Sequence, residues 1–339
     1  MRGVNKLFMS SLSALLLGLT TVTAAQSATT TLRITSASPK QMDDSKALVE
    51  TVEYLKKASN GTVILKPFFS AALFGEVDGM SAAQNGLVDM AIACTCNLTK
   101  LTSAFLFADL PYMFKSIESG KQVWASDAGA RVKDQLAQDT NLVALAFAPS
   151  GGGHRLLLNN KRTVKVPADF SGMKIRTTAT PLEQAFWKQA GAVPTPIDIS
   201  ETYSALQQGV VDAEHLQPLW TEMLKHDEVT KHGTEIGALL VYRTIAINSK
   251  SLDKLDAAQK VALQKAMKFF EERAYHHNQV GRDRSLAAIK KNGMKVYMPT
   301  QDEMKQWQKL GEDFRHSEVV KRAIPADLID QVLAAQKGF

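Results

Sequence analysis

The chain has 339 residues, of which 45% are hydrophobic and 22% are charged. This length suffices for two domains that each bury a core, and the composition excludes a disordered chain. The formal net charge of +6 does not indicate nucleic-acid binding, because lysine and arginine are dispersed among acids and form no basic arm. We therefore expect a globular protein without a nucleic-acid partner.

The amino terminus differs from the rest of the chain. Arg2 and Lys6 precede an uncharged run at residues 7–19, and small residues follow at positions 24–28. The run is shorter than the roughly 17 to 25 apolar residues that span a bilayer. This pattern predicts a secretory signal peptide over residues 1–25 and export from a bacterial-type cell.

Strand and helix patterns alternate in the first half of the chain. Residues 31–36 alternate as a strand, residues 43–59 fit an amphipathic helix, and residues 63–67 form a second strand. Strand, helix and strand in this order predict a parallel α/β sheet. A helix around residues 121–136 and a strand at residues 143–147 complete the first predicted lobe.

The two cysteines, Cys94 and Cys96, are separated by one residue. In an extended strand their side chains lie on one face, too far apart for a relaxed disulfide, so free thiols and a strained local bridge both stay open. Two cysteines supply only two metal ligands, and no nearby histidine pattern completes a set. We therefore expect no metal site here.

A glycine-rich run, Ser-Gly-Gly-Gly, occupies residues 150–153. It lacks the lysine of a phosphate-binding P-loop and the spacing of a dinucleotide fingerprint, so it does not predict a nucleotide cofactor. Hinges absorb changes in backbone dihedral angles at a few permissive positions. The run is therefore interpreted as a flexible connector where the chain crosses between two lobes.

Residues 170–220 are typical of two consecutive strand and helix units. A short strand carries Arg176 near its end, a second strand covers residues 193–199, Ser200 caps the next helix, and Val210 begins a third strand. Small ligands bind outside the carboxyl ends of strands in open α/β sheets. The planar guanidinium of Arg176 matches a carboxylate there with two charge-assisted hydrogen bonds. A surface ion pair with a neighbouring acid is the alternative.

One short pattern, A-x-Q-[N/Q]-G-x-V-D-x, occurs at residues 82–90 and again at residues 205–213. In both copies we predict a helix that ends at the glycine and a strand that leads toward the binding edge. Residues 94–97 and 214–217 would then emerge at that edge. Two similar α/β lobes that face each other would produce such a repeat.

A long helical pattern without proline runs from residue 252 to about residue 292. Leu263, Met267 and Phe270 form one apolar stripe along it. A helix of roughly 35 residues spans over ~50 Å at 1.5 Å per residue, which is longer than one lobe. Strands are predicted on either side, at residues 239–248 and 293–297.

Several runs are together similar to the signature of the DctP-type solute-binding proteins of TRAP (tripartite ATP-independent periplasmic) transporters. They are G-M-K-I-R, G-A-V-P-T-P-I and E-T-Y-S-A-L-Q-Q-G-V-V-D within residues 172–212, L-F-G-E-V-D-G-M and N-G-L-V-D-M-A within residues 73–91, D-L-P-Y-M-F at 109–114, and R-L-L-L-N-N at 155–160. Similar matches extend over nearly the whole mature chain.

The resemblance implies an α/β fold of the periplasmic binding protein kind. Two α/β lobes would surround a ligand cleft and be joined by hinge strands and by a long helix that spans both lobes. We expect lobe I to comprise residues 29–152 and 243–282, and lobe II to comprise residues 153–242 and 283–339.

The resemblance also implies roles for single residues. The family arginine that matches Arg176 clamps the substrate carboxylate, and Arg155 matches a second arginine that contacts the substrate. Glu76, in L-F-G-E, matches an acid that hydrogen-bonds polar groups of the ligand, and Asn97 is expected beside it on the first lobe. Tyr203, in E-T-Y, is a further candidate near the cleft, for which a structural role stays equally open.

The chain departs from the family at residues 211–218, which read V-D-A-E-H-L-Q-P. Many relatives carry an asparagine before this proline, and it also contacts the carboxylate. Gln217 or His215 is expected to supply a polar group in its place. The Glu214-His215 pair is also similar to relatives for 2-oxo acids, some of which bind a cation with the ligand near this point, and that role stays open.

The class of carboxylate is left open by the residues around the predicted cleft. One set of side chains suits a dicarboxylate, namely Arg155, Arg176, Arg243 and His154. Another set suits an aromatic or branched monocarboxylate, namely Phe68, Phe69 and Trp220. We include Trp220 among the predicted binding residues, although tryptophan is also common in protein cores.

The resemblance implies a periplasmic solute-binding protein that captures a small organic acid and delivers it to TRAP transporter membrane subunits. Uptake in that family is driven by an ion gradient, so no nucleotide or other cofactor is expected, and we expect a monomer. A binding protein that serves a sensory receptor would use the same pocket. A secreted enzyme is less favoured, because the chain has no G-x-S-x-G or H-E-x-x-H motif.

Overall fold

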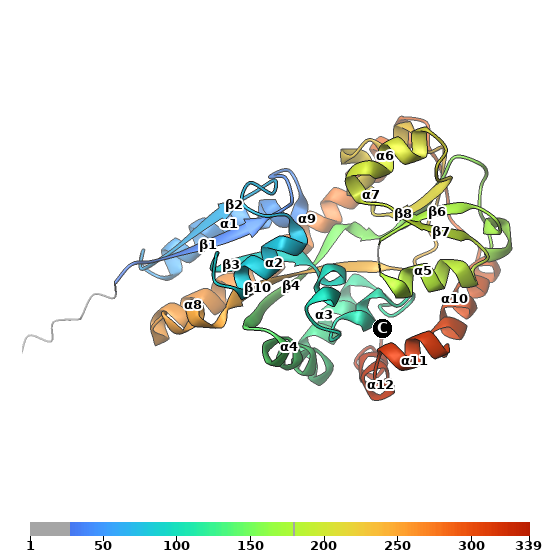
Figure 1. The fold of residues 1–339 in the computed structure, drawn as a ribbon. Helices are drawn as coiled ribbons and strands as arrows, with labels where there is room; N and C mark the ends of the chain where they lie inside the picture. The colour runs from blue at the N-terminus through green and yellow to red at the C-terminus, as the bar shows by residue number, and fades with distance from the viewer. Residues whose placement is uncertain (1–27, 179) are drawn as a thin grey trace, which may run out of the picture.

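The computed structural model describes residues 28–178 and 180–339. The predicted signal peptide lies outside the described residues. Two β-sheets with their covering helices form two lobes (Figure 1). We call the lobe that contains strand β1 (Thr30–Ser36) the first lobe and the lobe that contains strand β6 (Lys174–Thr177) the second lobe. No helix among the described residues is long and apolar enough to cross a bilayer.

The first lobe is built on a five-stranded sheet in the order β2-β1-β3-β10-β4. Its strands are β1, β2 (Val63–Phe68), β3 (Met90–Cys94), β4 (Leu142–His154) and β10 (Leu240–Asn248). β1, β2 and β3 are parallel, as predicted, but β10 runs antiparallel to both β3 and β4. The predicted parallel sheet is therefore mixed, because β10 enters the sheet from the second lobe and runs in the opposite direction.

The second lobe is built on a six-stranded sheet in the order β11-β9-β5-β8-β6-β7. Besides β6, its strands are β5 (Leu156–Asn159), β7 (Val193–Pro196), β8 (Ala213–Leu216), β9 (His232–Thr234) and β11 (Lys295–Tyr297). β6, β7 and β8 are parallel, whereas β5 is antiparallel to β8 and β9. The carboxyl ends of the parallel strands therefore meet at one edge, as expected from the sequence.

Helices surround both sheets (Figure 1). Four helices precede β4, namely α1 (Asp43–Ala58), α2 (Glu76–Gln84), α3 (Ile117–Ala125) and α4 (Asp127–Asp139), and α8 (Ser249–Asp253) directly follows β10. Those of the second lobe are α5 (Pro181–Gln189), α6 (Ile199–Gln207) and α7 (Pro218–Met223). The last three are α10 (Gln301–Arg315), α11 (Glu318–Ala323) and α12 (Ala326–Ala334). The single helix predicted around residues 121–136 is divided, because Ser126 has an extended backbone.

The predicted long helix is α9 (Ala257–Lys291), with 35 residues. Its predicted apolar stripe is buried, at Leu263, Met267 and Phe270. Its first half packs on the core of the first lobe, and Gly281 further along approaches Leu219 of α7 in the second lobe. The prediction that this helix spans both lobes is therefore confirmed.

The predicted connector at residues 150–153 is not a separate linker but part of strand β4, which crosses between the lobes as predicted, and its flexibility stays a prediction. Gly151, Gly152 and Gly153 have φ angles of +73°, +87° and +87°, which favour glycine. A Cβ on Gly151 would lie 2.7 Å from the Cβ of Gln217. The glycines thus allow an irregular turn of the backbone within β4, where the pairing with β10 shifts register, while neighbouring elements approach this backbone closely.

Cys94 and Cys96 form a disulfide, which decides between the two states that the sequence left open. The assumption that both cysteines lie in a strand is wrong, because β3 ends at Cys94 and a 3-10 turn begins at Thr95. This turn brings the two Cα atoms to 5.2 Å, within the usual range for a disulfide.

The repeated sequence pattern forms the same local structure in both lobes. The backbone turns at Gly86 and Gly209, with φ angles of +75° and +73°. The following aspartates bond a parallel strand of their own lobe, since Asp89 Oδ2 accepts from Arg33 N of β1 at 2.8 Å and Asp212 Oδ2 accepts from Lys174 N of β6 at 3.1 Å. This similarity agrees with two α/β units that face each other.

Two element boundaries in the second copy differ from the predicted ones. Helix α6 is capped by Asp198, whose carboxylate accepts from Ser200 N, and not by Ser200 itself. Strand β8 begins at Ala213 and not at Val210, because Val210 and Val211 still bond to the carbonyl of Ala205 at the end of the helix.

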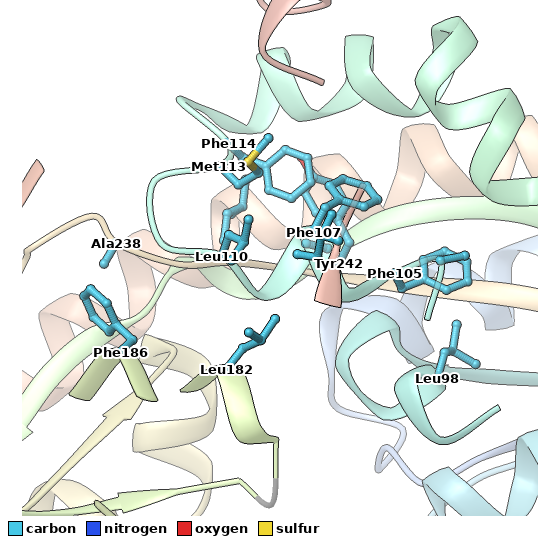
Figure 2. Close-up of a cluster of buried hydrophobic side chains, with 14 of the residues drawn as sticks. Leu98, Phe105, Phe107, Leu110, Met113, Phe114, Leu182, Phe186, Ala238 and Tyr242 are labelled. Carbon is cyan, nitrogen blue, oxygen red and sulfur yellow. The ribbon is translucent and has the colours of Figure 1, made fainter. Parts of the chain in front are cut away.

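A large apolar cluster continues from the first lobe to helix α5 (Figure 2). Leu182 and Phe186 of α5 face toward Leu110 and Ala238 across this cluster. Gln336, after the last helix, donates to Met113 O, so the carboxyl terminus lies against the first lobe. The predicted lobe boundaries fall inside β4, β10 and α9, and they stay a prediction.

A substitution at Gly120 of helix α3 tests the packing of this cluster. Its missing side chain makes room for the buried Tyr242 ring, because a Cβ at Gly120 would lie 1.9 Å from Tyr242 Oη. Helix propensity alone would make Gly120→Ala more stable by about 1 kcal/mol. Overpacking costs about 1 to 3 kcal/mol, so we expect a net lower melting temperature in calorimetry. Gln122→Ala, an exposed change on the same helix, should leave the melting temperature nearly unchanged. A more stable Gly120→Ala variant would contradict this account.

Candidate ligand-binding site

A cavity of about 850 Å³ lies between the two lobes. Its walls include residues at or near the carboxyl ends of four strands, namely Cys94 of β3, Arg176 of β6, Pro196 of β7 and Leu216 of β8. The first residues of α2, α5 and α6 also line it, namely Glu76, Pro181 and Ile199. The cavity thus occupies the edge at which ligands bind in open α/β sheets.

Arg176 lies in the cavity wall with only 7% of its surface exposed. Its Nε donates to Ile197 O at 2.9 Å, which fixes the plane of the guanidinium. Among the described residues, no hydrogen bond or ion pair engages its two terminal nitrogens. Burial lowers the pKa of Arg176, while the nearby carboxylates of Glu183 and Glu214 oppose this change. The terminal nitrogens are therefore available to a carboxylate that enters the cavity.

Arg155 lies in the same wall but has a protein partner. Its Nη1 forms a buried ion pair with Glu183 Oε1 at 3.1 Å. The other oxygen of Glu183 accepts from Thr178 N at 2.9 Å and from the Thr178 hydroxyl. Helix α5 thus supplies a carboxylate that holds Arg155 beside the loop that follows β6.

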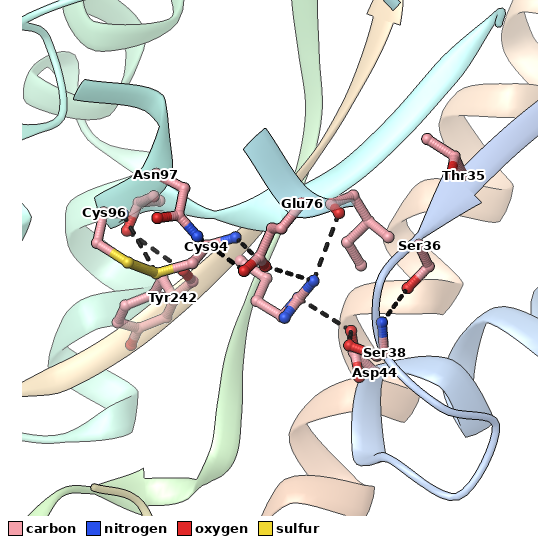
Figure 3. Close-up of polar contacts among 12 residues, drawn as sticks. Thr35, Ser36, Ser38, Asp44, Glu76, Cys94, Cys96, Asn97 and Tyr242 are labelled. Atoms are coloured by element: carbon pink, nitrogen blue, oxygen red, sulfur yellow. Dashed lines mark hydrogen bonds and ion pairs between the residues drawn. A yellow bond between two sulfur atoms is a disulfide. The ribbon is translucent and has the colours of Figure 1, made fainter. Parts of the chain in front are cut away.

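Arg243 of strand β10 occupies the first-lobe side of the cavity. Its Nη2 lies 2.7 Å from Glu76 Oε1, and its Nε lies 3.0 Å from Asp44 Oδ2 (Figure 3). Burial alone would lower the pKa of Arg243, but the carboxylates of Glu76, Asp44 and Asp43 together hold the pKa above its ordinary value. Arg243 is therefore a fixed cation that orients Glu76.

Glu76 connects this cation to the loop after β3. Its Oε1 also accepts from Cys94 N at 2.8 Å, and its Oε2 accepts from Asn97 Nδ2 at 2.7 Å (Figure 3). The carboxylate sits at the first position of helix α2, where the helix dipole favours a negative charge. These bonds set the orientation of Asn97, whose amide lines the cavity beside the disulfide.

Six of the eight predicted binding residues line the cavity, namely Arg155, Arg176, Glu76, Asn97, Gln217 and Trp220. Tyr203 and His215 are not among its described lining residues. The hydroxyl of Tyr203 donates to Glu228 Oε2 at 3.1 Å in an exposed hydrogen bond. The structure therefore gives Tyr203 a packing position and brings the other six together.

His215 is buried on the face of strand β8 opposite to Leu216, which lines the cavity. Its ring packs edge-on against Trp187. Burial lowers its pKa well below the ordinary value, and Arg155 lowers it further, so the ring stays neutral at pH 7. Its neighbour Glu214 is also buried and bonds His226 Nδ1 at 2.6 Å. Of the two residues proposed to replace the family asparagine, only Gln217 lines the cavity.

Three further residues that were considered for the ligand wall, namely Phe68, Phe69 and His154, lie outside the described lining of the cavity. Phe68 and Phe69 are not among the described lining residues and instead pack under the ammonium groups of Lys66 and Lys40. His154 is also outside the described lining, and burial lowers its pKa to about 4. No group of three or more metal-ligating side chains is found among the described residues.

Glu183, Asp44 and Thr178 were not predicted as site residues, although the two acids neutralise arginines of the cavity and Thr178 bonds one of these acids. Glu183 is the partner of Arg155, and Asp44 is a partner of Arg243. An acid in the first turn of a predicted helix was the available signal for Glu183 and Asp44. That signal is common to many helices, so only the folded geometry distinguishes these two acids.

Comparison with known proteins places this arrangement in a family. The profile of the family described as Bacterial extracellular solute-binding protein, family 7, also termed DctP, matches residues 35–317. The chain belongs to this family. The C4-dicarboxylate-binding periplasmic protein DctP of Rhodobacter capsulatus is 28% identical to this family 7 protein over 285 residues, which are 84% of each chain.

Two solved structures of TRAP periplasmic solute-binding proteins support the fold of this family 7 protein. One, from Sulfurospirillum deleyianum with bound succinate, has a TM-score of 0.80 and 25% identity over 91% of this chain and 99% of that chain. Another, from Roseobacter denitrificans with bound β-D-glucuronate, has a TM-score of 0.82 and 22% identity over 90% and 99%. The predicted two-lobe fold is confirmed, and the family is one of binding proteins and not of enzymes.

Asp109, a buried acid close to Glu183 and Arg155, should make the stability of the protein depend on pH. Burial raises its pKa to about 7, and its Oδ2 is buried without a hydrogen-bond partner among the described residues. The folded protein therefore binds this proton more tightly than the unfolded chain, whose carboxyl has a pKa of about 4. The resulting stabilisation is present below about pH 4 and is lost as the pH rises to about 7.

Asp109→Asn should remove this part of the pH dependence, because an amide does not ionise. We expect the melting temperature of the wild type, measured by calorimetry from pH 4.5 to 8, to fall more steeply than that of the variant. Asp134→Asn, an exposed change on α4, serves as the control and should follow the wild type. Parallel curves for the wild type and Asp109→Asn would show that Asp109 is already ionised at low pH.

Proposed function

We propose that this family 7 protein captures a small organic carboxylate in the cavity and delivers it in the periplasm to the membrane subunits of a TRAP transporter. The observation that carries the proposal is Arg176, a buried arginine in the cavity wall with its terminal nitrogens free of described protein partners. A carboxylate that replaces the lost water contacts of this cation forms two parallel charge-assisted bonds. The predicted monomeric state is part of the same proposal.

The proposed ligand bridges the two lobes. Its carboxylate binds Arg176 of the second lobe, and its polar groups contact Asn97 and Glu76 of the first lobe. Gln217 and Trp220, at the start of α7 and next to Gly151 of β4, complete the contacts. Contacts with both lobes exist together only when the lobes are close, so binding shifts the population toward the closed form. Membrane subunits that recognise the closed form would then take up the ligand with the energy of an ion gradient.

The comparisons support a carboxylate ligand. The Rhodobacter capsulatus relative is named for C4-dicarboxylates, and the two solved structures hold succinate and β-D-glucuronate. All three ligands carry a carboxylate, which is the group that the free fork of Arg176 matches. A binding protein that serves a sensory receptor would use the same contacts, and it differs only in the membrane partner.

Removal of the Arg176 guanidinium tests the proposal. Native mass spectrometry on gently purified protein should first detect a retained carboxylate, and titration calorimetry should then give its affinity. Arg176→Ala leaves the bound carboxylate desolvated and unpaired, so we expect binding to weaken by about 2 to 5 kcal/mol. Arg131→Ala removes a surface arginine that pairs with Asp327 and should bind as the wild type does. Equal affinities of wild type and Arg176→Ala would refute the role of Arg176.

A further inference from the structure

The charged residues of the cavity restrict the number of carboxylates that a ligand can carry. Three arginines line the cavity among the described residues, namely Arg155, Arg176 and Arg243. Arg155 is paired with Glu183 at 3.1 Å, and Arg243 is paired with Glu76 at 2.7 Å and Asp44 at 3.0 Å. Of the three, Arg176 alone has no ion pair with a described residue. The cavity therefore offers one arginine that is not already matched by a carboxylate.

Further acids surround this arginine. Glu76, Asp78 and Asp198 line the cavity themselves. Glu214 and Asp198 attract the positive charge of Arg176, although neither forms an ion pair with it. Glu214 is adjacent to Arg176 on the neighbouring strand, in register across β6 and β8. A second carboxylate of a ligand would thus meet acids and already paired arginines. A desolvated charge without a partner costs several kcal/mol, so this arrangement disfavours a dianion.

The remaining polar surface suits hydroxyl groups. Neutral side chains with hydrogen-bonding groups line both sides of the cavity, namely Asn97, Thr99, Ser150, Thr178, Thr180 and Gln217. The carboxylates of Glu76 and Asp198 are acceptors only. Protein groups already donate to them, but a carboxylate has about four lone-pair sites, so a ligand hydroxyl can donate a further hydrogen bond. A site built to bond hydroxyls rejects an analogue without them, because its own polar groups are then left unpaired. A purely apolar monocarboxylate is therefore disfavoured as well.

We infer that the ligand is a hydroxylated monocarboxylate, with one carboxylate on Arg176 and several hydroxyls along the acids and amides of both lobes. This inference rests on the proposed function and narrows its ligand class. Glu183 is the residue that decides the charge preference, because it neutralises the second arginine of the wall. It acts through Arg155, so it is a positioning residue for specificity.

A factorial ligand set tests the inference. Gluconate, glucarate, hexanoate and adipate all have six carbons, and they combine one or two carboxylates with hydroxyls or with none. The four-carbon set of threonate, tartrate, butyrate and succinate repeats the design at a smaller size. In titration calorimetry we expect the hydroxylated monocarboxylate of at least one set to bind at least tenfold tighter than its three partners.

Three outcomes would overturn the inference. They are tighter binding of a dicarboxylate than of its matched monocarboxylate, equal binding of hydroxylated and unhydroxylated monocarboxylates, and no binding of any of the eight acids. None of them refutes the proposed function by itself. A carboxylate retained in native mass spectrometry and lost in Arg176→Ala would still support that function.

Glu183→Gln tests the reason for the preference. The amide keeps an acceptor for Thr178 but removes the charge that neutralises Arg155, so a second ligand carboxylate gains a cation. We expect the ratio of glucarate to gluconate affinity, or of tartrate to threonate affinity in the smaller set, to rise at least tenfold. Glu272→Gln removes an exposed acid of α9 and should leave the ratio unchanged. An unchanged ratio in Glu183→Gln would show that Glu183 does not set the charge preference.

Discussion

The pairing of β4 with β10 is the constraint on which the arrangement of both lobes depends. These antiparallel strands pair from Leu142 and Asn248 inside the first sheet to His154 and Leu240 at the border of the second lobe. The pairing shifts register at residues 150–153, and there side chains complete the backbone hydrogen bonding, since Gly151 N donates to Asp43 Oδ2 at 3.0 Å. Helix α9 runs along the same ribbon, since Arg282 Nη1 donates to Gly152 O at 3.0 Å. The two lobes are thus joined by a strand pair with one irregular stretch and by a long helix.

The same ribbon carries the charge that organises the first-lobe wall. Arg243 lies on β10 and reaches Asp44 at the start of α1 and Glu76 at the start of α2. Buried ion pairs gain stability only when further hydrogen bonds satisfy their remaining atoms. Glu76 meets this condition through Cys94 N and Asn97. The polar wall of the cavity is therefore set before a ligand arrives.

Sequence patterns predicted most elements, because their signals lie within the elements. The apolar stripe of α9 and the glycines that end the two repeat helices are local signals, and both were confirmed. The inclusion of residues 150–153 in β4 was missed, because this run is an irregular stretch with positive φ angles, and only the pairs with β10 on either side of it place it in a strand. Tertiary pairing decides such segments.

Most residues of the candidate site were predicted from the sequence, but the ion pairs that neutralise two of its arginines were not. Arg176 was found because a strand end and a family motif coincide at it. The ion pair of Arg155 with Glu183 was not predicted, because the two residues are 28 positions apart in the sequence. The same holds for Arg243 and Asp44, which are about 200 positions apart. Side-chain pairs over such separations leave no periodic signal in one sequence. Tyr203 was predicted near the cleft from a family motif and His215 as a replacement for the family asparagine, although each side chain contacts another partner.

The Cys94–Cys96 disulfide affects the entropy of ligand capture. The bridge closes a turn whose ends hold Cys94 N on Glu76 and the Asn97 amide on the same carboxylate. A covalently closed turn has few conformations to lose, so the ordering of this wall takes place when the protein folds and not when a ligand binds. A larger share of the contact energy on this side can therefore appear as affinity.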